Sequence, residues 1–382
     1  MLLTAPPPPK VAGQRRLLAL DGGGIRGVLT LEILAELEAV IRAEHDQENL
    51  VLADYFDYFA GTSTGAMIAT GLALGWPVER ILKSYVDSGP LLFEPIKKLR
   101  RVATLFGYKY PRAGLANQLQ AEYGTETRFG DAAFHSLLLV VVHNSTTDSP
   151  WPLSNNPDAL YNDSTLADCN LNLPLWQIVR ASTAAPVFFP PERVTLGTRE
   201  FIFVDGGITP FNNPAFQLFL QATLPEYRLE WETGEDKLLL VSVGTGSIPK
   251  AIPSLRSRDM NLVHTLKTVP GTLMAGAAMQ QDLMCRAIGR CRHGAPIDGE
   301  VGRVDSQRRT PPLFTYVRYN AELSADSFRE MSLDHLTSDE IVTGAQQLDG
   351  VEFMAELSEI GKAAAKEVNW ETFAGFRGVA SP

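Results

Sequence analysis

The sequence has few cysteines, no long apolar run and no excess of positive charge, and each absence argues against a class of protein. Three cysteines among 382 residues, Cys169, Cys285 and Cys291, are too few for a disulfide framework. No window contains the roughly 18 consecutive apolar residues that a membrane-spanning helix requires. The net charge of −10 argues against binding to a nucleic-acid polymer through a basic surface.

The amino-terminal segment also lacks the apolar core of a signal peptide. Residues 1–10 contain two leucines and then a run of four prolines, so we predict a flexible arm over 1–15 and the cytoplasm as the compartment. Cys285, Cys291 and His293 are too few and too poorly spaced for a metal cluster. We therefore expect no metal and no other cofactor.

What is present is the composition of an ordinary globular protein and an alternating pattern of strands and helices. Apolar residues 17–20 predict a strand and lead into a glycine-rich loop, after which apolar residues recur at helical spacing over 28–41. A second strand (55–60), a Gly-flanked turn and a helix (66–74) repeat this order, which is typical of a parallel sheet covered by helices. Further predictions are strands at 137–142, 201–204, 238–243 and 313–319, a loop over 146–172, and helices at 175–183, 215–223, part of 263–289, and 351–367.

The turn Gly61-Thr62-Ser63-Thr64-Gly65 has the pattern of a nucleophile turn between a strand and a helix. Such a turn exposes the serine hydroxyl at the edge of the sheet. Gly61 and Gly65 lack side chains that would collide with the neighbouring strand and helix. We interpret Ser63 as a candidate nucleophile.

The loop after the first strand allows two interpretations. Gly22, Gly24 and Gly27 match the dinucleotide-binding spacing, but the second strand does not end in the acidic residue that would hold a ribose. Alternatively, the N–H groups of Gly22, Gly23 and Gly24 form an oxyanion hole beside the serine. Arg26 would then bind a substrate phosphate or fix the loop by pairing with a carboxylate.

A nucleophilic serine needs a group that accepts its proton. His264, His293 and His335 lie in or near predicted helices and not in loops at strand ends. Asp205 follows an apolar strand and precedes two glycines. We therefore expect it to lie in a loop at the end of a strand, as Ser63 does. A partly buried carboxylate has a raised pKa and can act directly as a general base.

Three motifs in this order, DGGGIRG at 21–27, GTSTG at 61–65 and DGG at 205–207, resemble the patatin-like phospholipase family. ASTAAP at 181–186 and VSVGTG at 241–246 are similar to further patterns of that family. The resemblance covers about 15–250 and implies a three-layer α/β/α fold with a mostly parallel sheet and a catalytic domain over 16–250. It also implies a Ser63–Asp205 dyad, an oxyanion hole from the Gly22–Gly24 loop, and hydrolysis of fatty acyl esters in phospholipids or galactolipids.

Residues 251–382 match that family less distinctly, and we expect them to form a helical or mixed region packed on the same domain. Some bacterial patatin-like proteins of this size act in anti-phage defence as cyclic-nucleotide-activated effectors that degrade membranes. The resemblance therefore suggests a membrane phospholipid as substrate, a cyclic nucleotide as activator, peripheral association with the inner membrane, and assembly of identical chains. Transfer of the acyl group to an alcohol or thiol instead of water is an alternative at the same site.

Residues 89–112 combine apolar side chains with lysines and arginines, which is the composition of an interfacial segment. Such a segment would lie against lipid head groups or cover the site as a lid. The alternative is a helix that packs on the domain with its charges in water.

Overall fold

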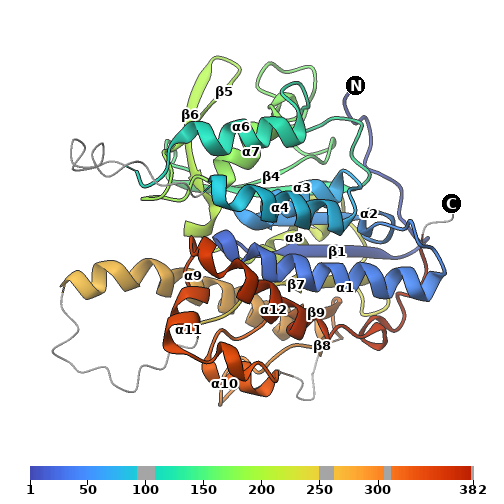
Figure 1. Cartoon of the computed structure of the whole chain (residues 1–382). Helices are drawn as coiled ribbons and strands as arrows, with labels where there is room; N and C mark the ends of the chain where they lie inside the picture. Colours follow the sequence, from blue (N-terminus) through green and yellow to red (C-terminus); the bar gives the residue numbers. More distant parts are fainter. Residues whose placement is uncertain (93–107, 249–261, 305–310, 380–382) are drawn as a thin grey trace.

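The computed structural model describes residues 1–92, 108–248, 262–304 and 311–379. Within them, nine strands form one sheet in the order β5-β6-β3-β2-β1-β7-β9-β8, with β4 also paired to β3 (Figure 1). The strands are β1 (Arg15–Leu20), β2 (Tyr58–Thr62), β3 (Leu137–Asn144), β4 (Ser149–Ser154), β5 (Glu192–Leu196), β6 (Arg199–Asp205), β7 (Leu238–Val243), β8 (Arg290–His293) and β9 (Thr315–Tyr319).

The centre of the sheet is parallel, as the strand–helix alternation predicts. β1 pairs in parallel with β2 and β7, and the pairs β2–β3, β7–β9 and β8–β9 are parallel too. The pairs β3–β4, β3–β6 and β5–β6 are antiparallel. The prediction of a mostly parallel sheet is therefore confirmed.

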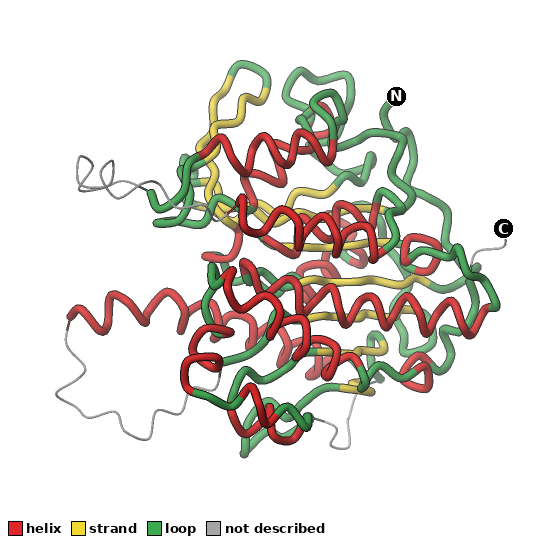
Figure 2. Tube along the Cα trace, viewed as in Figure 1, coloured by secondary structure: helices red, strands yellow, loops and turns green. Residues whose placement is uncertain are grey.

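The two faces of the sheet carry separate apolar cores. Alternate strand residues such as Leu18 and Leu20 pack with α1 (Gly27–His45), α3 (Thr64–Ala73) and α12 (Met354–Ala365). The intervening residues, such as Leu17 and Ala19, pack with α8 (Ala215–Thr223) and with Cys285 near the end of α9 (Leu262–Ile288). Helices therefore cover both faces, which confirms the three-layer architecture (Figure 2). The remaining helices are α2 (Leu52–Tyr55), α4 (Val78–Leu92), α6 (Arg112–Tyr123), α7 (Leu175–Ser182), α10 (Ala325–Glu330) and α11 (Asp339–Ala345).

Several element predictions are wrong in detail. The predicted strand over 55–60 begins only at Tyr58, because α2 occupies the residues up to Tyr55. The predicted loop over 146–172 contains β4, whose two prolines are tolerated because it pairs only with β3 and needs few ladder donors. β5 and β8 are also absent from the predictions, since each is a short strand at one edge of the sheet.

Residues on either side of the predicted catalytic domain pack against it. The N–H of Leu3 donates to Gly130 O at 2.7 Å, and Lys10 Nζ donates to His135 O at 2.8 Å. At the other end, α12 packs along α1 so closely that a Cβ on Gly361 would lie 2.9 Å from Leu29 Cα. The described part of 251–382 therefore shares a core with the sheet.

The predicted interfacial segment 89–112 lies, over residues 93–107, outside the described residues. No helix in the described part of the chain combines the length and apolarity needed to cross a bilayer.

Candidate active site

Ser63 lies between the end of β2 and the start of α3, in a backbone conformation that only a tight turn imposes. Its φ of 54° and ψ of −123° are unusual for a residue with a side chain. The turn leaves no room at its flanks, since a Cβ on Gly61 would lie 2.1 Å from Gly65 O and one on Gly65 would lie 2.3 Å from Leu20 O. Both glycines are therefore required by space, and the strain is of the kind found at functional sites.

A hydrogen-bond chain fixes the backbone of this turn. The N–H of Ser63 donates to Ser182 Oγ at 2.9 Å, and Ser182 Oγ donates to Val141 O at 2.7 Å. Ser182 lies in the ASTAAP segment, which the sequence analysis singles out without giving any residue in it a role. The structure shows that it joins the serine turn to β3.

The strand register brings Asp205 beside Ser63. β2 pairs with β3 as far as Thr62 opposite Val141, and there the chain turns away at Ser63. β4 occupies the other edge of β3, so β6 takes the vacated edge, with Asp205 opposite Val142. The end of antiparallel β6 therefore meets the end of parallel β2.

The side chains of the two residues meet directly. Ser63 Oγ donates to Asp205 Oδ2 at 2.6 Å, and the Gly207 N–H donates to Asp205 Oδ1 at 2.6 Å. Asp205 is only 4% exposed, and this burial raises its pKa to about 6, although the two hydrogen bonds and the charge of Arg180 oppose the rise. The carboxylate is thus ionised at neutral pH and has the proton affinity of a useful general base.

The three candidate histidines are not the hydrogen-bond partner of Ser63 Oγ. His293 Nε2 lies 3.2 Å from a carboxylate oxygen of Glu367, and His335 Nε2 lies 2.9 Å from one of Glu359. His264 lies on α9. The group bonded to the serine hydroxyl is the carboxylate.

The carbonyl groups of the glycine loop are all held by hydrogen bonds. Gly22 O accepts from Asn212 Nδ2 and Thr245 Oγ1, Gly23 O accepts from Arg26 N and Nε, and Gly24 O accepts from Thr64 Oγ1 and Tyr85 Oη. In a trans peptide the following N–H points away from the carbonyl. These contacts therefore turn the N–H groups of Gly23 and Gly24 to the opposite side, and neither has a hydrogen-bond partner among the described residues.

Gly22 does not have the predicted role. Its N–H donates to Asn212 O at 3.0 Å and so is not free to donate to a substrate. Because Gly22 has no side chain, the loop can approach the serine turn closely: a Cβ on Gly22 would lie 3.3 Å from the Cβ of Ser63. A linear pattern does not reveal which N–H groups the fold engages, so the sequence predicts a free N–H at all three glycines.

Arg26 contacts the loop itself. Its Nε donates to Gly23 O at 3.3 Å, so the contact is with a backbone carbonyl and not with the carboxylate considered above. Burial lowers its pKa to about 10, against the opposing effect of the Asp21 charge. This contact favours the alternative in which Arg26 fixes the loop, with the Gly23 carbonyl as its partner in place of a carboxylate.

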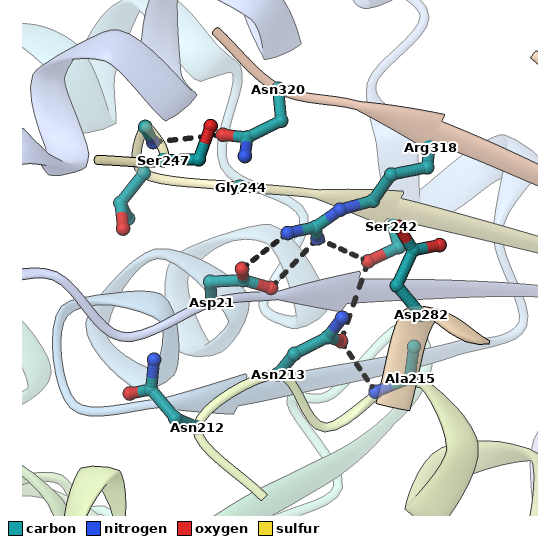
Figure 3. A network of polar contacts seen from close by, with 12 residues as sticks. Asp21, Asn212, Asn213, Ala215, Ser242, Gly244, Ser247, Asp282, Arg318 and Asn320 are labelled. Carbon is teal, nitrogen blue, oxygen red and sulfur yellow. Dashed lines mark hydrogen bonds and ion pairs between the residues drawn. The ribbon is translucent and has the colours of Figure 1, made fainter. Parts of the chain in front are cut away.

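A buried ion pair anchors the start of the loop (Figure 3). Arg318 on β9 donates to both carboxylate oxygens of Asp21, at 2.8 and 2.5 Å, and also to Ser242 Oγ at 2.6 Å. Burial lowers the pKa of Arg318, but the charge and the hydrogen bonds of Asp21, together with smaller effects of Tyr316 and Asp282, outweigh it and raise the pKa. Arg318 belongs to the region 251–382, for which the sequence predicts no part in the site.

The other end of the loop is held by the same region. The N–H of Ile25 donates to Leu348 O at 2.8 Å, and Tyr110 Oη donates to Asp349 Oδ2 at 2.6 Å, next along the chain. Leu348 O lies so close to Gly24 that a Cβ there would be 2.0 Å away, and Gly24 has a φ of 59°. A glycine is required at this position for both reasons.

The described residues offer neither a dinucleotide-binding turn nor a metal cluster. β2 ends in the serine turn and not in an acidic residue, so the ribose contact of the dinucleotide alternative is missing. Among the residues that the structure describes, no group of three or more His, Cys, Asp or Glu side chains could hold a metal ion. Cys285 is on α9 and Cys291 is on β8.

Comparison with known proteins identifies the family of the chain. The sequence model of the family described as Patatin-like phospholipase matches residues 18–219. Patatin-17 of Solanum cardiophyllum is 32% identical over 287 residues, covering 70% of each chain. A cGAMP-activated phospholipase of Escherichia coli (strain TW11681) is 28% identical over 247 residues, covering 64% of this chain and 65% of the relative.

Other relatives are covered less completely. Patatin-T5 of Solanum tuberosum is 30% identical over 246 residues, which span only 60% of its length. Among solved structures, human GIVD cytosolic phospholipase A2 aligns with 95% of this chain and 60% of its own, at 14% identity and a TM-score of 0.44.

Proposed function

Because the chain belongs to the patatin-like phospholipase family, we propose that it is a serine lipid acyl hydrolase that cleaves fatty acyl esters of membrane phospholipids. The observation that carries the proposal is the 2.6 Å hydrogen bond from Ser63 Oγ to Asp205, in a turn whose strain presents the hydroxyl. Family membership alone would not identify the reacting atoms. The buried carboxylate beside the serine supplies the chemistry that an ester hydrolase needs.

The proposed reaction has two stages. Asp205 accepts the proton of Ser63 Oγ as that oxygen attacks the ester carbonyl carbon, and the negative charge develops on the carbonyl oxygen. The N–H groups of Gly23 and Gly24 and the amino end of α3 stabilise this oxyanion. The protonated Asp205 then gives its proton to the departing alcohol oxygen of the lysolipid.

The second stage releases the fatty acid. Asp205 takes a proton from water, whose oxygen attacks the acyl-serine carbonyl, and returns it to Ser63 Oγ as the ester breaks. An alcohol or thiol in place of water would give acyl transfer at the same site. Product analysis with an added acceptor alcohol separates the two outcomes.

Activation by a cyclic nucleotide is a second proposal, supported by the description of the E. coli relative as cGAMP-activated. The anti-phage role, the cytoplasmic and membrane-peripheral location and the assembly of identical chains are proposals that go with it. Full activity without any cyclic nucleotide, together with no binding of cyclic di- or trinucleotides, would contradict the activation proposal.

The test of the main proposal is release of fatty acid from defined phospholipids by the wild type, Ser63→Ala and Asp205→Asn, each with and without cyclic nucleotides. We expect Ser63→Ala to fall to background and Asp205→Asn to lose about 10²–10⁴-fold in rate, because one lacks the nucleophile and the other the base. Circular dichroism checks that both variants are folded.

Matched controls come from the exposed loop after β4, which begins beside the start of β3, at the end of the strands away from Ser63. Ser164→Ala and Asp158→Asn make the same chemical changes at exposed positions and should leave the rate unchanged. A Ser63→Ala variant as active as the wild type would overturn the proposed function.

A further inference from the structure

The helix α9 (Leu262–Ile288) extends beyond the sheet and the helices around it (Figure 1). Residues 268–281 of this helix include no charged side chain. Leu273 is 67% exposed and Met279 is 41% exposed. A helix surrounded by water normally has charged residues on its exposed face, so this composition is typical of a different environment.

α9 contacts the segment that carries Asp205. Met274 Cε would lie 3.4 Å from a Cβ on Gly207, the glycine whose N–H binds the Asp205 carboxylate. The next residue, Ile208, is 50% exposed. The uncharged helix therefore adjoins the catalytic loop.

A fourth exposed apolar residue comes from a segment that contacts the backbone of Asp205. The N–H of Asp205 donates to Ala184 O at 3.1 Å, and Val187, three residues later, is 75% exposed. Val187 has a φ of 73°, a strained conformation for a β-branched residue. The N–H of Lys109 donates to Val187 O at 3.0 Å and helps to hold it there.

From these observations we propose that Val187, Ile208, Leu273 and Met279, here called the apolar rim, enter the acyl-chain region of a lipid bilayer and bring the site to its substrate. This inference rests on the proposed function.

The position of the apolar rim favours a bilayer over a second protein chain as its occupant. The rim comes from segments that contact the loop of the proton-accepting Asp205. A chain docked there permanently would cover the approach of a lipid to Ser63. A bilayer supplies the substrate through the same contact and matches the uncharged surface.

The test is a double variant, Leu273→Ser with Met279→Ser, in the full chain. Loss of two apolar anchors should weaken binding to phosphatidylcholine vesicles about tenfold or more and lower their hydrolysis in proportion. Hydrolysis of a soluble short-chain ester should stay within about twofold of the wild type, because neither residue touches Ser63 or Asp205.

The matched control is Leu160→Ser with Leu166→Ser, at residues that are 57% and 51% exposed. These two lie in the loop that follows β4. Asn155 of that loop accepts a hydrogen bond from the N–H of Leu138 near the start of β3, so the loop lies at the end of the strands away from Ser63. The control should bind and hydrolyse vesicles as the wild type does.

Three results would count against the inference. Vesicle binding by the rim variant equal to that of the control would overturn it. A change from oligomer to monomer with unchanged vesicle binding would assign the rim to a second copy of the chain and also overturn it. A fall in soluble-ester hydrolysis equal to the fall on vesicles would make the rim residues structural supports of the site instead.

Binding is measured separately with Ser63→Ala as the background, so the two proposals can fail separately. Wild-type protein that binds vesicles through the rim but hydrolyses no ester would refute the proposed function and leave the rim proposal supported.

Discussion

Asparagine in place of Asp205 should lower the catalytic rate by about 10²–10⁴-fold and, at the same time, stabilise the folded protein at neutral and alkaline pH. Asp205 is buried and has a pKa raised from 3.8 to about 6. The folded state therefore holds the proton more tightly than the unfolded state does. Well below pH 3.8 the acid is protonated in both states, and its ionisation does not affect stability.

The sign and the size of the effect follow from this shift. As the pH rises from about 4 to 6, the unfolded state loses its proton first, so the free energy of unfolding falls. Above pH 6 the full effect persists, and a shift of about two pKa units corresponds to about 3 kcal/mol. The wild type thus keeps a destabilising charge at the pH where it works.

The asparagine variant has no such charge and keeps both contacts of the protonated acid. Its amide oxygen can accept from the Gly207 N–H, and its amide nitrogen can donate to Ser63 Oγ, the two groups that now bind the carboxylate. We therefore expect Asp205→Asn to be more stable than the wild type by up to about 3 kcal/mol at pH 8 and nearly equal to it at pH 4.

Guanidinium unfolding at pH 4 and pH 8, followed by tryptophan fluorescence, measures the difference. The control Asp158→Asn, at an exposed residue, should show no such pH-dependent gain. An asparagine variant that is less stable than the wild type at pH 8, or whose advantage is the same at both pH values, would refute the reasoning that burial raises the pKa of Asp205.

Two further predictions concern the rate. Wild-type kcat/KM on a soluble ester should rise about tenfold per pH unit below pH 6 and level off above it, because only ionised Asp205 accepts the serine proton; a profile that is flat between pH 4.5 and 7 would exclude this base. Gly24→Ala should lower kcat about 10²-fold with a smaller change in KM, because the new Cβ would displace Leu348 O and shift the oxyanion donors. The matched control Gly13→Ala has a similar φ of 74° but open space around it, and it should retain its rate; equal losses in both variants would contradict a role for the Leu348 contact.

The fold was predictable where the local pattern is strong. The strand over 238–243 and the helix over 215–223 agree with β7 and α8 because long apolar runs and helical spacing are visible without neighbours. β4, β5 and β8 were missed, because short edge strands depend on a partner strand more than on their own residues.

For the site, the sequence determined the residue types and their order. The Gly-flanked Ser63, the glycines after β1 and the Asp-Gly-Gly at 205–207 are local features, since each depends on the space and conformation within a few residues. They are sufficient to propose a nucleophile, a base and an oxyanion loop.

Only the tertiary structure decided how these parts work together. The distance from Ser63 to Asp205 depends on β6 replacing β2 beside β3. This pairing brings together two residues that lie more than 100 positions apart in the sequence. The engagement of the Gly22 N–H and the anchoring of the loop by Arg318 and Leu348 depend likewise on remote segments. Hydrogen bonds and burial of this kind are properties of packing, so a linear pattern supplies the groups and the fold selects which of them are free to act.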